Sequence, residues 1–171
     1  MSTLNATTPQ AFAVEQIAQM VAECEEFQDE AGVTSADDAL EFISYPEYII
    51  PQAFSDPQIT KPFAVVYHKS FSRSEVGDGT TMPRGEVFLQ LGRPIVNYDD
   101  SKTEETLFSN FAGAITDRVL ELSRDGTGRL HITGIADVVA PRRSAPEHES
   151  MLGAQKPYYF AEYVISWDPI G

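Results

Sequence analysis

Apolar residues in this chain follow two spacings, and the order of those spacings along the sequence limits the folds open to it. Three segments have apolar residues three or four positions apart, which is typical of amphipathic helices. Four others have the period of two that is typical of strands. The order predicts an α+β fold, α-(α)-β-β-α-β-β, with a mostly antiparallel sheet and helices packed against it.

The first helix is predicted from Pro9 to Glu30. Thr8 has the side chain of a good N-cap, Pro9 suits the first helical position, and Gly32 is the natural stop. Its expected apolar stripe consists of Val14, Ile17, Ala18, Val21 and Cys24.

Two further helices are expected after it. A short one is predicted over Ser35–Ile43, where Ser35 and Asp38 have capping-box-like spacing. A long one is predicted over residues 102–124, introduced by a capping box of Ser101 and Glu104. Its expected core stripe is Leu107, Phe108, Phe111, Ile115, Val119 and Leu122.

Strands are predicted over Phe63–Phe71, Glu86–Leu91, Arg129–Val139 and Tyr158–Trp167. The third has Gly134 in its interior, which predicts a bulge. The last has apolar residues at odd and even positions, so we expect it to be covered on both sides.

The length of 171 residues predicts a single domain over 1–171, with a flexible N-terminus at 1–8. Four prolines fall within 45–62, and that density predicts a Pro-rich loop. Polar composition predicts long loops at 72–84 and 141–156.

The charge balance of 12 Lys and Arg against 26 Asp and Glu gives a net charge of −14. A field of that sign repels nucleic-acid phosphates and anionic lipid surfaces. Two interpretations stay open. The charge can serve solubility alone, or it can line a surface that DNA passes without sticking.

Candidate chemistry is sparse. The lone Cys24 lies on an apolar helical stripe, and the three histidines (His68, His131 and His148) have no ligand spacing. The acidic pairs Asp37–Asp38, Asp99–Asp100 and Glu104–Glu105 fall at helix starts, where capping accounts for them. We therefore expect no catalytic residues, no metal and no cofactor. The first ten residues lack the pattern of a secretory signal, and no apolar run approaches the roughly 18 residues of a membrane span.

Four features of the sequence bear on family. They are an N-terminal amphipathic helix, the strand signal Lys61–Tyr67 (KPFAVVY) with its return strand Gly85–Leu91 (GEVFLQL), the long helix over 102–124, and a final aromatic strand ending Ala161–Trp167 (AEYVISW). In these features, from about residue 10 onward, the chain resembles the phage tail terminator (tail completion) family. Members are small α+β proteins that form a hexameric ring closing the tail tube beneath the head.

The resemblance implies a structural virion protein that forms a homo-oligomeric ring, ends tube growth and joins tail to head. The implied partners are other copies of the chain, the tail-tube protein and a head or neck connector, with DNA passing through unbound and no membrane contact. Aromatic and basic loop residues are candidates for subunit contacts. These candidates are Tyr45, Tyr48, Phe54, Arg142 and Arg143.

Other functions stay open. Within the same class, the chain can be another neck connector or a tail-tube protein, which would stack into many rings. Outside it, the alternatives are an interaction protein of another kind, or a small-ligand-binding domain or enzyme with an unrecognised site.

Overall fold

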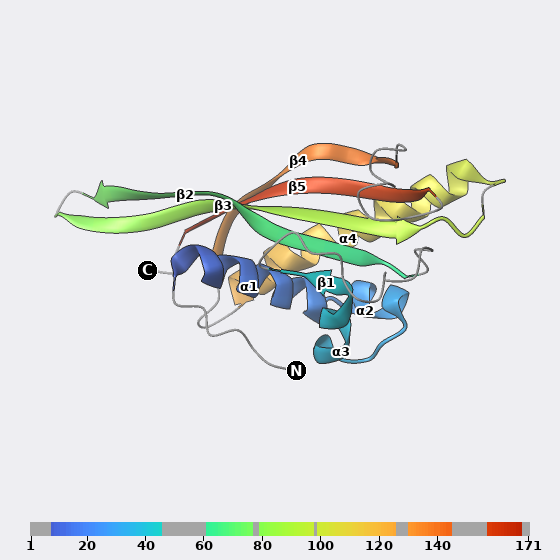
Figure 1. The fold of residues 1–171 in the computed structure, drawn as a ribbon, viewed down its shortest axis with the longest axis horizontal. Helices are drawn as coiled ribbons and strands as arrows, with labels where there is room; N and C mark the ends of the chain where they lie inside the picture. Colours follow the sequence, from blue (N-terminus) through green and yellow to red (C-terminus); the bar gives the residue numbers. More distant parts are fainter. Residues whose placement is uncertain are drawn as a thin grey trace.

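The computed structural model describes residues 8–45, 61–76, 79–97, 99–125, 130–144 and 157–168. The helices are α1 (Pro9–Glu23), α2 (Glu25–Ala31), α3 (Ala36–Ala39), the 3-10 turn Leu40–Phe42 and α4 (Ser101–Asp125). The strands are β1 (Ile43–Ser44), β2 (Phe63–Val76), β3 (Thr80–Pro94), β4 (His131–Arg143) and β5 (Tyr158–Asp168). One sheet carries the helices on one of its faces (Figure 1). The predicted α+β fold is confirmed.

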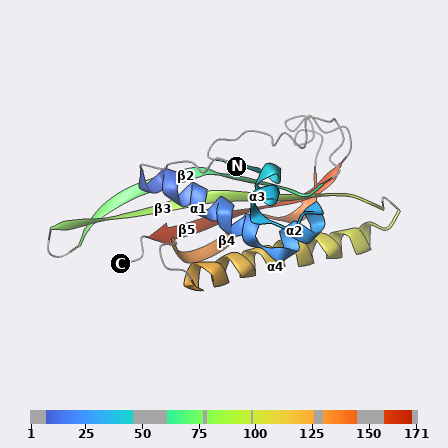
Figure 2. The same ribbon diagram turned by 90° about the horizontal axis from the view of Figure 1, so that it is seen from below.

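The strand order in the sheet is β1-β2-β3-β5-β4. β1 is parallel to β2, and every other pairing is antiparallel. α1 packs against β2 and α4 against β4, so the two long helices cover one face of the sheet (Figure 2). β5 lies between β3 and β4 and is almost wholly buried, as its two apolar faces predict.

The first helix begins as predicted, with Thr8 Oγ1 accepting a hydrogen bond from the Ala11 amide at 3.3 Å. Its predicted continuation to Glu30 is wrong, because the backbone at Cys24 is extended (φ −68°, ψ 121°). α1 therefore ends there and α2 starts in a new direction that buries Phe27. Gly32 ends α2 with φ 74°, a left-handed conformation that suits glycine.

The short second helix is also interrupted. Ser35 caps it as predicted, accepting from the Asp38 amide at 3.1 Å. The predicted extension to Ile43 is wrong: the helical turn ends at Phe42, and Ile43 begins β1, which pairs with Ala64 and Val65. A two-residue strand has too few residues for periodicity to reveal it.

The long helix α4 has the predicted core stripe, except that Leu107 is exposed. Its predicted capping box is wrong. Asp100 caps the helix instead, accepting from the Thr103 amide at 3.2 Å, while the Glu104 carboxylate binds Arg93 and two backbone amides of the preceding loop. The buried Glu104 carboxylate thus links α4 to Arg93 on β3 and to the loop that connects the two elements.

The core has a large part beneath the helices and a smaller part on the opposite face of the sheet. The smaller part consists of Phe63, Val65, Tyr158 and Phe160. Gly92 lies opposite Phe63 in the sheet, and a Cβ at Gly92 would meet the Phe63 ring at 2.1 Å. Glycine is therefore required there for the aromatic ring to lie across β3.

Two of the predicted loops are partly strand. The sequence predicts a long connection over 72–84, but β2 continues to Val76 and β3 begins at Thr80. It also predicts a loop from Pro141, but β4 continues to Arg143. The predicted bulge near Gly134 is confirmed as a register shift between Ile132 and Gly134.

None of the described helices is both long enough and apolar enough to cross a membrane.

Candidate functional site: a hairpin arm and the groove at its base

The outer part of the β2–β3 hairpin projects beyond the helical layer (Figure 1). In this part, which we call the arm, Ser72–Val76 pairs only with Thr80–Arg84 among the described strands. β5 pairs with β3 no further out than Gly85. Five residues of strand span about 16 Å. The arm is thus a two-stranded ribbon, a form that is only marginally stable alone in water.

The two strands of the arm stay paired to its outer end. Val76 pairs with Thr80, and Gly79 has φ 86°, which is the left-handed region. Glycine suits that conformation because it has no Cβ.

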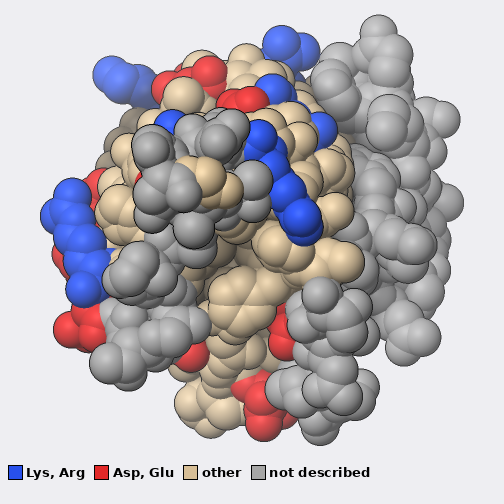
Figure 3. All heavy atoms as spheres, turned by 90° about the vertical axis from the view of Figure 1, so that its left-hand side faces the viewer, with Lys and Arg blue, Asp and Glu red and all other residues tan. Residues whose placement is uncertain are grey.

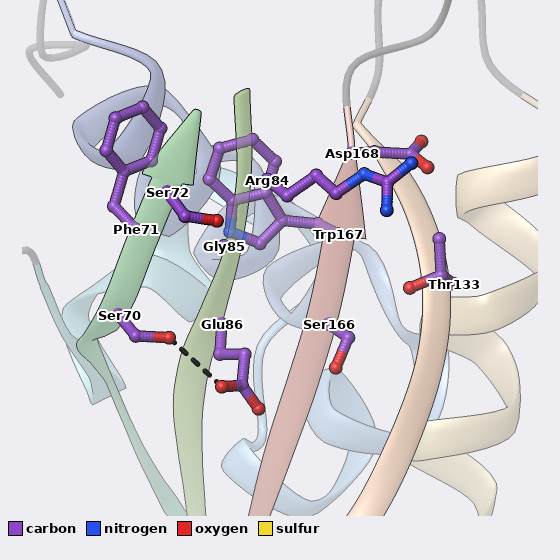
Figure 4. Close-up of a pocket in the computed structure, with 10 residues that line it drawn as sticks. All are labelled: Ser70, Phe71, Ser72, Arg84, Gly85, Glu86, Thr133, Ser166, Trp167 and Asp168. Carbon is purple, nitrogen blue, oxygen red and sulfur yellow. Dashed lines mark hydrogen bonds between the residues drawn. The ribbon is translucent and has the colours of Figure 1, made fainter. Parts of the chain in front are cut away.

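An open groove lies at the base of the arm, on the face of the sheet away from the helices (Figure 4). Its volume is about 510 Å³. Four strands line it with Ser70, Phe71, Ser72, Arg84, Gly85, Glu86, Thr133, Ser166, Trp167 and Asp168. Register shifts flank it on both sides, in β2 between His68 and Ser70 and in β4 at Thr133. Such irregularities change the direction of side chains in a sheet, and they are frequent next to active sites.

The two carboxylates of the groove already have partners. Glu86 Oε1 accepts from Lys69 Nζ at 3.1 Å and from Ser70 Oγ at 3.0 Å. The bond from Lys69, then that from Ser70, lowers the pKa of Glu86. Asp168 Oδ1 lies 2.6 Å from Nδ1 of His131.

Two donors near the base of the arm, on opposite faces of the sheet, are without partners in the structure. The Trp167 side chain is buried, yet its indole N–H has no acceptor within reach in the structure. The indole packs over Gly85 of β3, where a Cβ would meet it at 2.7 Å, on the face of the sheet that carries the helices and the main core. Arg84 is exposed and forms no ion pair with any described residue. Arg84 shares a face of the sheet with Glu86, so its guanidinium is a donor that the groove offers.

The predicted contact residues fall in different places. Tyr45 is half-buried after β1 and packs against the main core, where burial, and then the charge of Glu15, raises its pKa. Tyr45 is thus tied into the fold. Tyr48 and Phe54 lie outside the described residues.

Arg142 and Arg143 lie on β4, an edge strand, and both are exposed. The guanidinium of Arg142 lies 5.6 Å from the centroid of the Phe160 ring, a cation–π contact. Their role in subunit contacts stays a prediction. The structure brings neither of them to the groove.

The histidines have no metal-ligand spacing in the sequence. In the fold, however, His131 lies beside Asp168, where the ends of β4 and β5 meet. In the part of the chain that the structure describes, no three His, Cys, Asp or Glu side chains gather in an arrangement that could hold a metal ion.

Sequence reasoning predicted a hairpin with a long polar connection over 72–84; it missed that the connection is largely strand, and it missed the groove. One signal was available: Gly77-Asp78-Gly79 is typical of a tight hairpin turn, and Thr80 and Thr81 favour strand. No family model matches the chain, and a search of curated proteins gives no match either.

Proposed function

We propose that this chain is a structural virion subunit that assembles with copies of itself into a ring at the head-proximal end of a phage tail, where it ends tube growth and joins tail to head. The proposal is for six subunits, with the tail-tube protein on one side and a head or neck connector on the other. Assembly would take place in the host cytoplasm.

The observation that carries the proposal is the arm. Ser72–Val76 and Thr80–Arg84 form a ribbon that projects from one end of the sheet and pairs only with itself among the described strands. A ribbon of this kind gains most of its stability by packing on another surface. Because it projects, that surface belongs to a neighbouring molecule. Exposed strand edges add backbone hydrogen bonds as a means of docking.

The net charge of −14 supports the same role. A ring through which DNA moves benefits from a surface that repels phosphate, since attraction would hold the DNA in place. The acidic balance fits a conduit better than a nucleic-acid-binding protein.

The test is a shortened arm. A variant that joins Ser72 to Arg84 through an Asn-Gly turn removes the arm and keeps the pairing with β5, because Ser72 and Arg84 are cross-strand partners. Negative-stain electron microscopy and mass measurement are applied to both proteins, alone and with purified tail tubes. We expect closed rings, or capped tube ends, for the wild type and neither for the variant. Circular dichroism and a thermal melt establish that the variant folds.

Three outcomes contradict the proposal in different ways. A wild-type chain that stays monomeric and leaves tube ends bare refutes the ring. Long tubes of the wild type favour the tail-tube alternative. A folded short-arm variant that forms the same rings as the wild type refutes the role of the arm.

A further inference from the structure

The sheet has two lateral edges among the described strands, and both are open over much of their length. β1 pairs with β2 only at Ala64 and Val65, so the outer edge of β2 from Ser70 to Val76 has no described partner strand. β4 pairs with β5 on one side and with no described strand on the other. We propose that the sheet continues from copy to copy, with the outer edge of β2 in one molecule pairing antiparallel with the outer edge of β4 in the next. The inference rests on the proposed self-assembly and names the two edges that carry it.

The backbone at the outer edge of β2 requires a strand as its partner. About half of the residues in an edge strand direct their N–H and C=O groups away from the sheet. Ser70–Val76 presents an unbroken row of such groups, because it pairs with β3 without a register shift and contains no proline. The outer edge of β3 in the arm is interrupted by Pro83, which has no N–H to donate. An added strand satisfies the row on β2, and its main-chain hydrogen bonds supply the affinity.

Strand direction selects β4 of another copy as that strand. The path from β2 to β4 crosses three antiparallel pairings, so β2 and β4 run in opposite directions. Two copies in the same orientation therefore bring β4 of one beside β2 of the other as antiparallel neighbours, which is the more stable pairing. Because the two edges are different surfaces, the contact is head-to-tail and repeats from copy to copy. Pairing of β2 with β2 would instead stop at a dimer.

The regular part of β4 is Gly134–Asp137, which pairs with β5 without a shift. Register shifts lie on both sides of it, so an added strand finds regular backbone here. Within one molecule Gly134 is level with Ser70 of β2, through Ser166 and Glu86. Pairing Gly134–Asp137 with the part of β2 beyond Ser70 therefore offsets successive copies along the strands. A sheet that closes on itself requires such an offset.

Copies joined in this way keep their helices on one side of the shared sheet. At the arm end, viewed in Figure 3, Lys and Arg side chains are most frequent over the upper part of the described surface, which is the side of β4 and β5 in Figure 1. These charges thus lie mainly over a face of the molecule, whereas the proposed contact uses backbone groups at the edges. Raised salt should therefore change the association little.

Lysine on the β4 edge tests the contact, because a charged side chain on an edge strand opposes strand addition. Val138, directly after the regular part of β4, is 51% exposed. Val138→Lys is expected to weaken self-association of the full chain at least about tenfold in sedimentation velocity. Val96→Lys is the matched control, since Val96 is 75% exposed in the loop before α4, and it should associate like the wild type. Equal association of the two variants contradicts the role of β4.

Disulfide cross-linking tests which edges meet. Ser72 of β2 and Ala136 of β4 are exposed and lie on the same face of the sheet, the one without helices. Ser72→Cys, Ala136→Cys and Gly134→Cys each add one thiol, and a Cβ at Gly134 meets nothing within 4 Å. Under mild oxidation, Ser72→Cys mixed with one of the two β4 variants is expected to form several times more covalent dimer than either protein alone. The wild type is the control, because its single cysteine, Cys24, is buried.

The outcomes separate the paired edges from the ring. Covalent dimer formed equally well by Ser72→Cys alone overturns the inference, since it shows β2 pairing with β2. Association without a disulfide in any mixture overturns the paired edges and leaves the proposed ring standing. When Ser72→Cys is combined with a β4 cysteine in one chain, closed covalent hexamers support both proposals, and open covalent chains support the edges and refute the ring. A wild type that is monomeric at every concentration refutes both.

Discussion

Glu104→Ala is expected to destabilise the fold by about 3 kcal/mol, a value that follows from the contacts of one buried carboxylate. Glu104 Oε2 accepts from Arg93 Nη1 at 3.2 Å and from the Val96 amide at 3.3 Å, and Oε1 accepts from the Asn97 amide at 3.1 Å. The side chains of Arg93 and Glu104 are only 10% and 6% exposed. The variant therefore leaves one guanidinium and two amides with fewer partners.

The magnitude lies between two limits. Removing one partner of a fully buried ion pair costs about 3–5 kcal/mol, because the other charge is left unpaired. Here Arg93 keeps a second carboxylate, with its Nε at 3.1 Å from Glu30 Oε2, and that carboxylate side chain is 39% exposed. The cost therefore falls at the low end of the range. Glu30→Ala should cost about 1 kcal/mol or less, since solvent screens the exposed partner.

Urea unfolding followed by circular dichroism measures both variants, with an unchanged m-value as the condition for comparison. The double variant Arg93→Met with Glu104→Met should be more stable than the sum of the single effects, since the one charge it leaves unpaired, that of Glu30, is 39% exposed and solvated. A loss of less than about 1 kcal/mol in Glu104→Ala would refute the reasoning. So would a loss in Glu30→Ala as large as that in Glu104→Ala.

Three further predictions concern the core. Gly92→Ala should destabilise by about 1–3 kcal/mol in urea unfolding, because the new methyl group overlaps the buried ring of Phe63. Gly113→Ala in α4, where nothing lies within 4 Å, is the control and should stabilise by about 0.5–1 kcal/mol; equal effects would contradict the packing. The Ser123 hydroxyl donates to the Leu130 carbonyl at 2.9 Å and accepts from the Ile132 amide at 2.8 Å, and Ser123→Ala removes both bonds. The variant should lower the free energy of unfolding by about 1–3 kcal/mol, by the same amount in fluorescence and in circular dichroism. Burial, and then the charge of Glu26, raises the pKa of Cys24 from 9.0 to about 12, so Ellman's reagent should react slowly with the folded chain at pH 8 and rapidly in urea. Because the folded-state pKa is the higher one, the thiol's contribution to stability is full below pH 9.0 and is lost as the pH rises toward 12; fast reaction in the folded state would contradict this burial.

The sequence predicts the elements that bury one face. The stripe from Val14 to Cys24 is fully buried, and the apolar residues on both faces of the last strand mark the centre of the sheet. Thr8 marks the start of α1 because its hydroxyl accepts from a backbone amide of the first turn, and Gly32 marks the end of α2 because it adopts a left-handed conformation. Each of these signals is carried by residues close together in the chain, so a single sequence contains it.

The missed features depend on distant partners or on the lack of a buried face. Periodicity reports burial, and a projecting ribbon or an edge strand buries little, so neither the arm nor the end of β4 has an alternating pattern. The bend at Cys24 goes with its Sγ donating to the Met20 carbonyl at 3.2 Å in a buried site. The groove combines Ser70, Arg84 and Trp167, which only the pairing of β2, β3 and β5 brings together.

The position of β5 has a consequence for biosynthesis. It is the last of the five strands to be made, yet it fills the central place between β3 and β4. Until it leaves the ribosome, β3 presents an unpaired edge and β4 has no neighbour to join. The sheet therefore completes only after nearly the whole described chain has been translated, and contacts so far apart in sequence form slowly. A chain that lacks β5 has no strand to join β3 to β4, so this five-stranded sheet cannot form before β5 is made.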